Sequence, residues 1–74
     1  MTHRQILAQA VEKLKTAGIT EADNDARLLW EYAFNMSRTG WLMYADCEAD
    51  ADKIPVYEEY IERRASHEPL QYIE

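Results

Sequence analysis

The apolar residues between positions 22 and 34 recur every three or four positions, which is the spacing of one face of an α-helix. They are Ala22, Ala26, Leu29, Trp30, Ala33 and Phe34. Because this face is wide, we expect the helix to pack against two neighbours. The chain has two glycines and two prolines in 74 residues, which is little turn material for a sandwich or barrel of short strands. The sequence therefore predicts an all-α fold.

A first helix is predicted over residues 2–17 and a second over residues 21–34. Thr2 and Gln5 have the spacing of a capping box at the start of the first helix. Gly18 follows that helix, where a residue without Cβ most easily takes the left-handed backbone that ends a helix. Both ends of the first helix are therefore marked in the sequence.

Two further helices are predicted in the second half. A short one over residues 38–44 is expected to turn Trp41 and Leu42 inward. Residues 45–51 carry alternating acids and little apolar content, so we read them as a loop. The last predicted helix spans residues 53–65 and has a proline in its first turn, where the missing N–H costs nothing. We expect a small bundle of four to five helices.

The character of the sequence changes after residue 65. Pro69 disfavours helical backbone at Glu68, and residues 71–73 suit a strand. A strand cannot stand alone, because its backbone groups need a partner. We therefore predict a helical domain over residues 1–65, and read residues 66–74 as an extended linker at the start of a β-hairpin that leads to a further domain.

Acidic residues outnumber basic residues by 14 to 8, and the formal net charge is −6. A nucleic-acid-binding protein needs a basic face, so direct contact with nucleic acid is not expected. The net charge is −1 over residues 1–37 and −5 over residues 38–74. A basic partner would be steered toward the second half, although a solvated acidic surface accounts for the same charge.

The expected cellular location follows from three features that the sequence lacks: a disulfide, a signal peptide and a membrane-spanning segment. Cys47 is the single cysteine and cannot make an intramolecular disulfide, which suits a reducing compartment. No apolar segment of a signal peptide follows the first residues. No apolar run approaches the ~20 residues that span a bilayer. We expect a cytoplasmic protein that does not contact a membrane.

Four acids in the predicted loop fall at every second position: Asp46, Glu48, Asp50 and Asp52. This spacing is typical of a calcium loop, but Ala51 stands where that loop needs glycine and Tyr57 where it needs glutamate. A solvated loop is the favoured interpretation. Asp52 also has the position of a cap for the last helix.

Few residues offer catalytic chemistry. Cys47 and His67 could form a nucleophile pair, but nothing near either residue supports one. His3, Cys47 and His67 lack the spacing of metal ligands. The two glycines form no phosphate loop. Arg64 falls on the inner face of the last helix and is expected to pair with an acid such as Asp25. We expect no catalytic, metal or cofactor site in the chain.

Three stretches in order resemble one known family. They are Ala17-Gly18-Ile19 before Asp25-Ala26-Arg27-Leu28-Leu29, then Met36-Ser37-Arg38-Thr39, then Arg63-Arg64 before Glu68-Pro69-Leu70-Gln71-Tyr72-Ile73. Together they resemble the N-terminal domain of HemK/PrmC-type protein-(glutamine-N5) methyltransferases over nearly the whole chain. These enzymes methylate the glutamine of the Gly-Gly-Gln motif in class 1 peptide chain release factors. His67 stands where the family commonly has glycine, so the helix ends without a left-handed residue or His67 adopts that backbone.

The resemblance implies a helical bundle joined by a β-hairpin to a Rossmann-like domain, which holds S-adenosylmethionine and an Asn-Pro-Pro-Tyr motif. The chain contains neither that motif nor a glycine-rich loop, so we carry over no catalytic or cofactor-binding residue. The implied partners are a class 1 release factor and the C-terminal methyltransferase domain. The candidate contacts with the release factor are Asp46, Glu48, Asp50, Asp52 and Arg63. The candidate connector residues are Glu68, Pro69, Leu70 and Tyr72.

Two alternative functions stay open. The chain could be a stand-alone acidic helical protein-interaction domain with no enzymatic role. It could also belong to a methyltransferase of the same type that acts on another protein.

Overall fold

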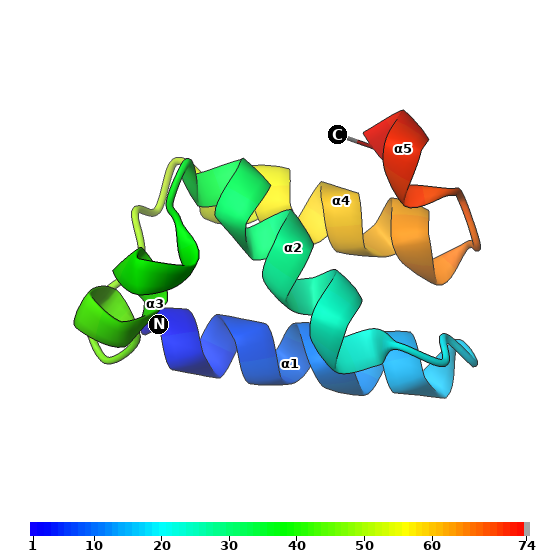
Figure 1. The fold of residues 1–74 in the computed structure, drawn as a ribbon, viewed down its shortest axis with the longest axis horizontal. Coiled ribbons are helices and arrows are strands. Elements are labelled where there is room, and N and C mark those ends of the chain that lie inside the picture. The colour runs from blue at the N-terminus through cyan, green and yellow to red at the C-terminus, as the bar shows by residue number, and fades with distance from the viewer. Residues whose placement is uncertain (74) are drawn as a thin grey trace.

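A computed structural model describes residues 1–73 of the chain and shows five helices within them. The helices are α1 (His3–Thr16), α2 (Ala22–Phe34), α3 (Arg38–Tyr44), α4 (Ile54–Ala65) and α5 (Leu70–Ile73). Helices α1, α2 and α4 pack against one another, and α5 lies on the C-terminal end of α4 (Figure 1). The all-α bundle predicted from the apolar spacing is confirmed.

Helix α1 has a partner for each of the four backbone N–H groups of its first turn. Thr2 and Gln5 form the predicted capping box, in which the Gln5 N–H donates to Thr2 Oγ1 and the Thr2 N–H donates to Gln5 Oε1. The N–H groups of His3 and Arg4 donate to the carbonyls of Cys47 and Ala45, and that of Ile6 donates to Thr2. The segment after α3 therefore completes the N-terminus of α1.

The core lies between α1, α2 and α4 and is joined by two buried hydrogen bonds. The Trp30 indole N–H of α2 donates to His3 Nδ1 of α1 over 3.0 Å. The Tyr57 hydroxyl of α4 donates to the Ala26 carbonyl of α2 over 2.8 Å. Burial raises the pKa of Tyr57, which keeps this hydroxyl protonated as a donor. Both bonds satisfy polar atoms that would otherwise be costly inside the core.

Two details of the helices differ from the sequence predictions. Lys53 occupies the N-cap position of α4, and its side chain forms no capping bond. Asp52 is therefore not the cap; its backbone N–H instead donates to Asp50 Oδ1 in a local turn. Leu42 is 82% exposed rather than inward, because α3 is short and packs on the core through Trp41.

Residues 70–73 form the helical turn α5, so the prediction of a strand over residues 71–73 is wrong. The Tyr72 N–H donates to the Pro69 carbonyl, which closes a turn with no partner strand. Ile73 is 4% exposed and belongs to the hydrophobic core. Burial of this side chain against α4 outweighs a local preference for extended backbone. The described residues contain no connector hairpin, and residue 74 lies outside them.

Among residues 1–73 no helix combines the length and the apolar character that crossing a bilayer demands.

Candidate functional site

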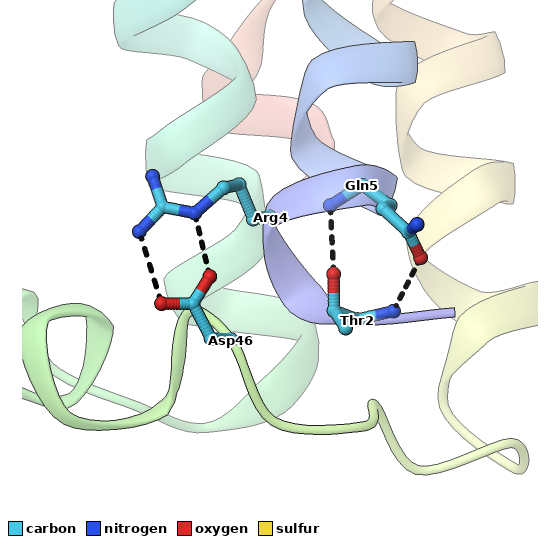
Figure 2. Close-up of polar contacts among 4 residues, drawn as sticks. All are labelled: Thr2, Arg4, Gln5 and Asp46. Atoms are coloured by element: carbon cyan, nitrogen blue, oxygen red, sulfur yellow. Dashed lines mark hydrogen bonds and ion pairs between the residues drawn. The ribbon is translucent and has the colours of Figure 1, made fainter.

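The acidic loop, residues 45–52, lies against the N-terminus of α1. Arg4 donates from Nε to Asp46 Oδ1 over 2.8 Å, and its guanidinium lies 5.8 Å from the centre of the Trp41 ring (Figure 2 shows the ion pair). The hydrogen bond and charge of Arg4 hold the pKa of the Asp46 carboxyl below its ordinary value, and Asp46 raises the pKa of Arg4 in return. The ion pair between Asp46 and Arg4 thus attaches the loop to α1.

Glu48 also makes an internal contact. Its Oε2 lies 2.9 Å from the amino group of Met1, and its backbone forms an isolated antiparallel bridge with Thr2. By contrast, within residues 1–73 neither Asp50 nor Asp52 forms an ion pair. Two of the four predicted contact acids are therefore neutralised, and two keep a charge available to a partner.

The acidic surface continues along the start of α4. Glu58 and Glu59 are exposed in the second turn of this helix, which begins two residues after Asp52. Glu62, one turn further on, forms an ion pair with Lys13 of α1. We define the acidic face as the predicted contacts Asp50 and Asp52 together with Glu58 and Glu59, none of which forms an ion pair within residues 1–73.

Arg63 lies apart from the acidic face and holds the connector. Its Nε donates to Glu68 Oε2, and its Nη2 donates to the Tyr72 carbonyl over 2.9 Å. Arg64 donates from Nη1 to the Glu68 carbonyl and from Nε to Asp25 Oδ2, each over 3.0 Å. The predicted pair of Arg64 and Asp25 is confirmed. The two arginines bring the connector residues together against α4.

The turn between α4 and α5 is anchored to α1 as well. His67 has a φ of 69°, so it adopts the left-handed backbone for which the family commonly uses glycine. Its Nε2 lies 2.9 Å from the Ala17 carbonyl. Leu70 packs on the core beside Ile73. The turn between α4 and α5 is therefore fixed to both α1 and α4.

Hollows among the described residues include two that are shallow and open to solvent and one that is more enclosed. A hollow of about 180 Å³ between α1 and α4 is lined by residues that include Ile6, Lys13, Tyr57 and Ile61. Ligand pockets are usually larger, about 300–1,000 Å³. Within residues 1–73 no group of three potential metal ligands is found. Cys47 contacts the N-terminal end of α1 and His67 its C-terminal end, so they do not form a pair.

Sequence reasoning missed His3, which is buried against aromatic rings. Its ring lies 5.6 Å from Trp30 and 4.9 Å from Phe34 between centroids, edge to face in both cases. Burial lowers its pKa. Its spacing of three residues from Ile6 was a signal that both share the inner face of α1.

Comparisons with known proteins identify the family of this chain. Residues 5–74 match the family model described as the PrmC N-terminal domain. The chain belongs to this family. A release factor glutamine methyltransferase of Deinococcus radiodurans is 37% identical over 73 residues, which is 99% of this chain and 26% of that protein. One from Caulobacter vibrioides is 39% identical over 64 residues, 86% of this chain and 22% of that protein.

A third relative of this PrmC N-terminal domain has a longer chain. A bifunctional methyltransferase of Rickettsia felis is 34% identical over 70 residues, which cover 95% of this chain and 13% of that protein. The chain thus spans about a quarter or less of the length of these relatives. No solved structure matches it.

Proposed function

We propose that the chain is the substrate-docking domain of an S-adenosylmethionine-dependent methyltransferase. The proposed substrate is the glutamine of the Gly-Gly-Gln motif in class 1 peptide chain release factors, and the proposed location is the cytoplasm. The observation that carries the proposal is the family match over residues 5–74, together with relatives named release factor glutamine methyltransferase. In this view the methyl transfer itself occurs in the remainder of the longer protein.

The more enclosed hollow among the described residues does not fit S-adenosylmethionine. The hollow between α1 and α4 is smaller than the usual ligand pocket, and Tyr57 on its wall already donates its hydroxyl to the Ala26 carbonyl. We therefore place the cofactor and all catalytic residues outside this chain. The contribution of the bundle would be to hold the substrate protein so that its glutamine reaches the catalytic domain, which reduces the entropic cost of the reaction.

The acidic face is the proposed contact surface for the release factor. Asp50 and Asp52 keep uncompensated charge, and the exposed Glu58 and Glu59 add to it along α4. Charges at the rim of an interface act mainly on the association rate, and salt screens them. Asp46 and Glu48 would support this surface through their internal contacts rather than touch the partner directly, whereas Arg63 is engaged by Glu68 and Tyr72.

The test is the rate at which a class 1 release factor associates with the chain, measured at several salt concentrations. We expect the double variant D50K/D52K to associate about tenfold more slowly at low salt, with the difference shrinking as salt rises. The matched control is E12K/E21K, which changes the net charge equally on exposed residues toward the opposite end of α1. Equal association rates for the two variants would contradict docking at the acidic face.

The same experiment also tests the wider proposal. If the wild-type chain binds no release factor, and the full-length protein transfers no methyl group to one, the proposed function is wrong. Methylation of a different protein by the full-length enzyme would move the proposal to another substrate.

A further inference from the structure

Helices α1 and α4 leave a partly enclosed hollow of about 180 Å³ between them. Four buried residues form its floor: Ile6 and Ala10 of α1, and Tyr57 and Ile61 of α4. Ala10 lies one turn after Ile6 and one turn before Leu14 on the buried side of α1. Its single methyl group leaves empty the space that a larger side chain would fill. The hollow is therefore a gap in the packing at one position of α1.

The floor of the hollow suits an apolar occupant. The Tyr57 hydroxyl already donates to the Ala26 carbonyl of α2, so the floor has no polar group that needs a partner. A cavity of about 150 Å³ lined by aliphatic and aromatic side chains is large enough to hold benzene. In size and lining, the hollow therefore matches one large apolar side chain, such as phenylalanine or leucine.

The rim of the hollow is polar and consists of Gln9, Lys13 and Glu58. All three residues are exposed, and their side chains are long and unbranched. They can swing aside while the backbone of both helices stays in place. The ion pair between Lys13 and Glu62 is also exposed, and pairs of this kind contribute little stability. An occupant can therefore enter the hollow at small cost to the fold.

The charge at the rim indicates the kind of segment that would bring this side chain. Glu58 lines the hollow and also belongs to the acidic face, where it forms no ion pair within residues 1–73. Lys13 is the one cation of the rim, and its charge is already balanced by Glu62. A segment that approaches the hollow therefore meets net negative charge, which favours lysine and arginine on either side of the apolar residue.

We propose that the hollow takes one large apolar side chain from a basic segment of the partner that docks on the acidic face. This inference rests on the proposed function, because it specifies the segment that the release factor would present there. The acidic face would speed association, since charges at a rim steer the encounter. The seated side chain would slow dissociation, as apolar anchors in pockets do at other interfaces.

The first test is the binding of three five-residue peptides with blocked ends, followed by NMR through the methyl signals of Ile6 and Ile61. The peptides are Lys-Lys-Phe-Lys-Lys, Lys-Lys-Ala-Lys-Lys and Glu-Glu-Phe-Glu-Glu. We expect the first to bind about tenfold more tightly than the second, because its ring leaves water. We expect the third to bind about tenfold more weakly than the first, because the acidic face repels it. Equal affinities in either comparison would overturn the inference.

A substitution that fills the hollow makes the test specific. Ala10→Leu should weaken the phenylalanine peptide about tenfold and leave the alanine peptide unchanged. Ala8→Leu is the matched control on the exposed side of α1, and it should change neither affinity. An Ala10→Leu variant that folds and binds the phenylalanine peptide as tightly as the wild type does would contradict the proposal.

A charge reversal at the rim decides the point if Ala10→Leu does not fold. Glu58→Lys replaces an exposed side chain, and Glu21→Lys is a control of equal charge at the start of α2. We expect Glu58→Lys to weaken Lys-Lys-Phe-Lys-Lys and to strengthen Glu-Glu-Phe-Glu-Glu, each by about threefold more than Glu21→Lys does. The same affinities for both variants would overturn the inference.

A class 1 release factor separates this inference from the proposed function. We expect Ala10→Leu to raise its dissociation rate about tenfold and to leave its association rate unchanged, whereas D50K/D52K slows association. A release factor that responds to D50K/D52K but leaves Ala10→Leu as slowly as it leaves the wild type would reject this inference alone. Peptides that bind in the expected order, with no binding of a release factor, would reject the proposed function alone.

Discussion

The Arg64 side chain makes two contacts that stabilise this small bundle. The Asp25 side chain is 5% exposed, and its carboxylate accepts a hydrogen bond from Arg64 Nε over 3.0 Å. The same guanidinium holds the Glu68 carbonyl. Removal of the arginine would leave a buried carboxylate without its counter-charge, which costs more than the pair itself contributes.

We therefore expect Arg64→Ala to lower the free energy of unfolding by about 3 kcal/mol. The measurement is urea unfolding followed by circular dichroism. Arg38→Ala is the matched control, because Arg38 is exposed at the start of α3 and forms no ion pair within residues 1–73. A similar midpoint for both variants would show that the Asp25 pair contributes little.

His3 makes stability depend on pH. Its Nδ1 accepts the Trp30 N–H, so this nitrogen must be unprotonated, and burial lowers the pKa of the ring from its ordinary value of 6.5. Because the folded-state pKa is below the unfolded one, the unfolded chain takes up the proton first as the pH falls. The contribution of His3 to the free energy of unfolding should be fully present above pH 6.5 and should decrease as the pH falls below that value.

Urea unfolding between pH 7 and about pH 5 tests this expectation, in a range where most carboxylates remain ionised. In His3→Gln the amide oxygen can still accept the indole N–H, but the side chain does not titrate. We expect the pH dependence to flatten in that variant. A wild-type free energy of unfolding that stays constant over this range would contradict the prediction.

At the scale of elements, the ends of the helices decide how the chain turns. α1 ends before Gly18, which has a φ of 85°, and the Ile19 N–H then donates to the Leu14 carbonyl. α2 ends at Asn35, and the turn after α4 passes through His67, both with positive φ. Three non-helical connections thus use a left-handed residue, and one of these residues is glycine.

Gly18→Ala should cost about 1 kcal/mol, because alanine lacks the freedom of glycine at positive φ. A Cβ at this position meets no atom within 4 Å, so the loss would report backbone strain and not a steric clash. Thermal unfolding measures it. An alanine variant as stable as the wild type would mean that the turn can rearrange at no cost.

At the scale of the whole molecule, α5 belongs to the same core as the three larger helices. Ile73 is buried and Leu70 packs on the core. Arg63 and Arg64 of α4 donate hydrogen bonds to the backbone carbonyls of Tyr72 and Glu68. The last helical turn is therefore fixed to the rest of the bundle.

Ile73→Ala should lower the free energy of unfolding by about 2 kcal/mol, the transfer free energy of a buried isoleucine side chain together with a small cavity. Tyr72→Ala is the control, since its side chain is exposed, and it should change stability by less than about 0.5 kcal/mol. Denaturant unfolding of the two variants decides the point. Equal, small effects would mean that α5 is not part of the cooperative unit.

The sequence by itself determined helices α1 to α4. The apolar spacing of α2, the capping box of Thr2 and Gln5, and the left-handed Gly18 are local features, and each was predicted because its cause lies within a few residues. The pairing of Arg64 with Asp25 followed from the same periodicity. The family resemblance rests on similarly local stretches and is confirmed by the match over residues 5–74.

The tertiary structure alone decided the helical turn of residues 70–73, the burial of His3 and the division of the acidic residues into paired and unpaired ones. Residues 71–73 favour a strand locally, but Ile73 gains more by packing on the core. Asp46 and Glu48 look like their neighbours in sequence, yet the fold brings Arg4 and the Met1 amino group to them. The reason is the same in each case. The energies that decide these features come from partners outside the local pattern, which are more than twenty residues away for His3, Asp46 and Glu48 and lie in α4 for α5.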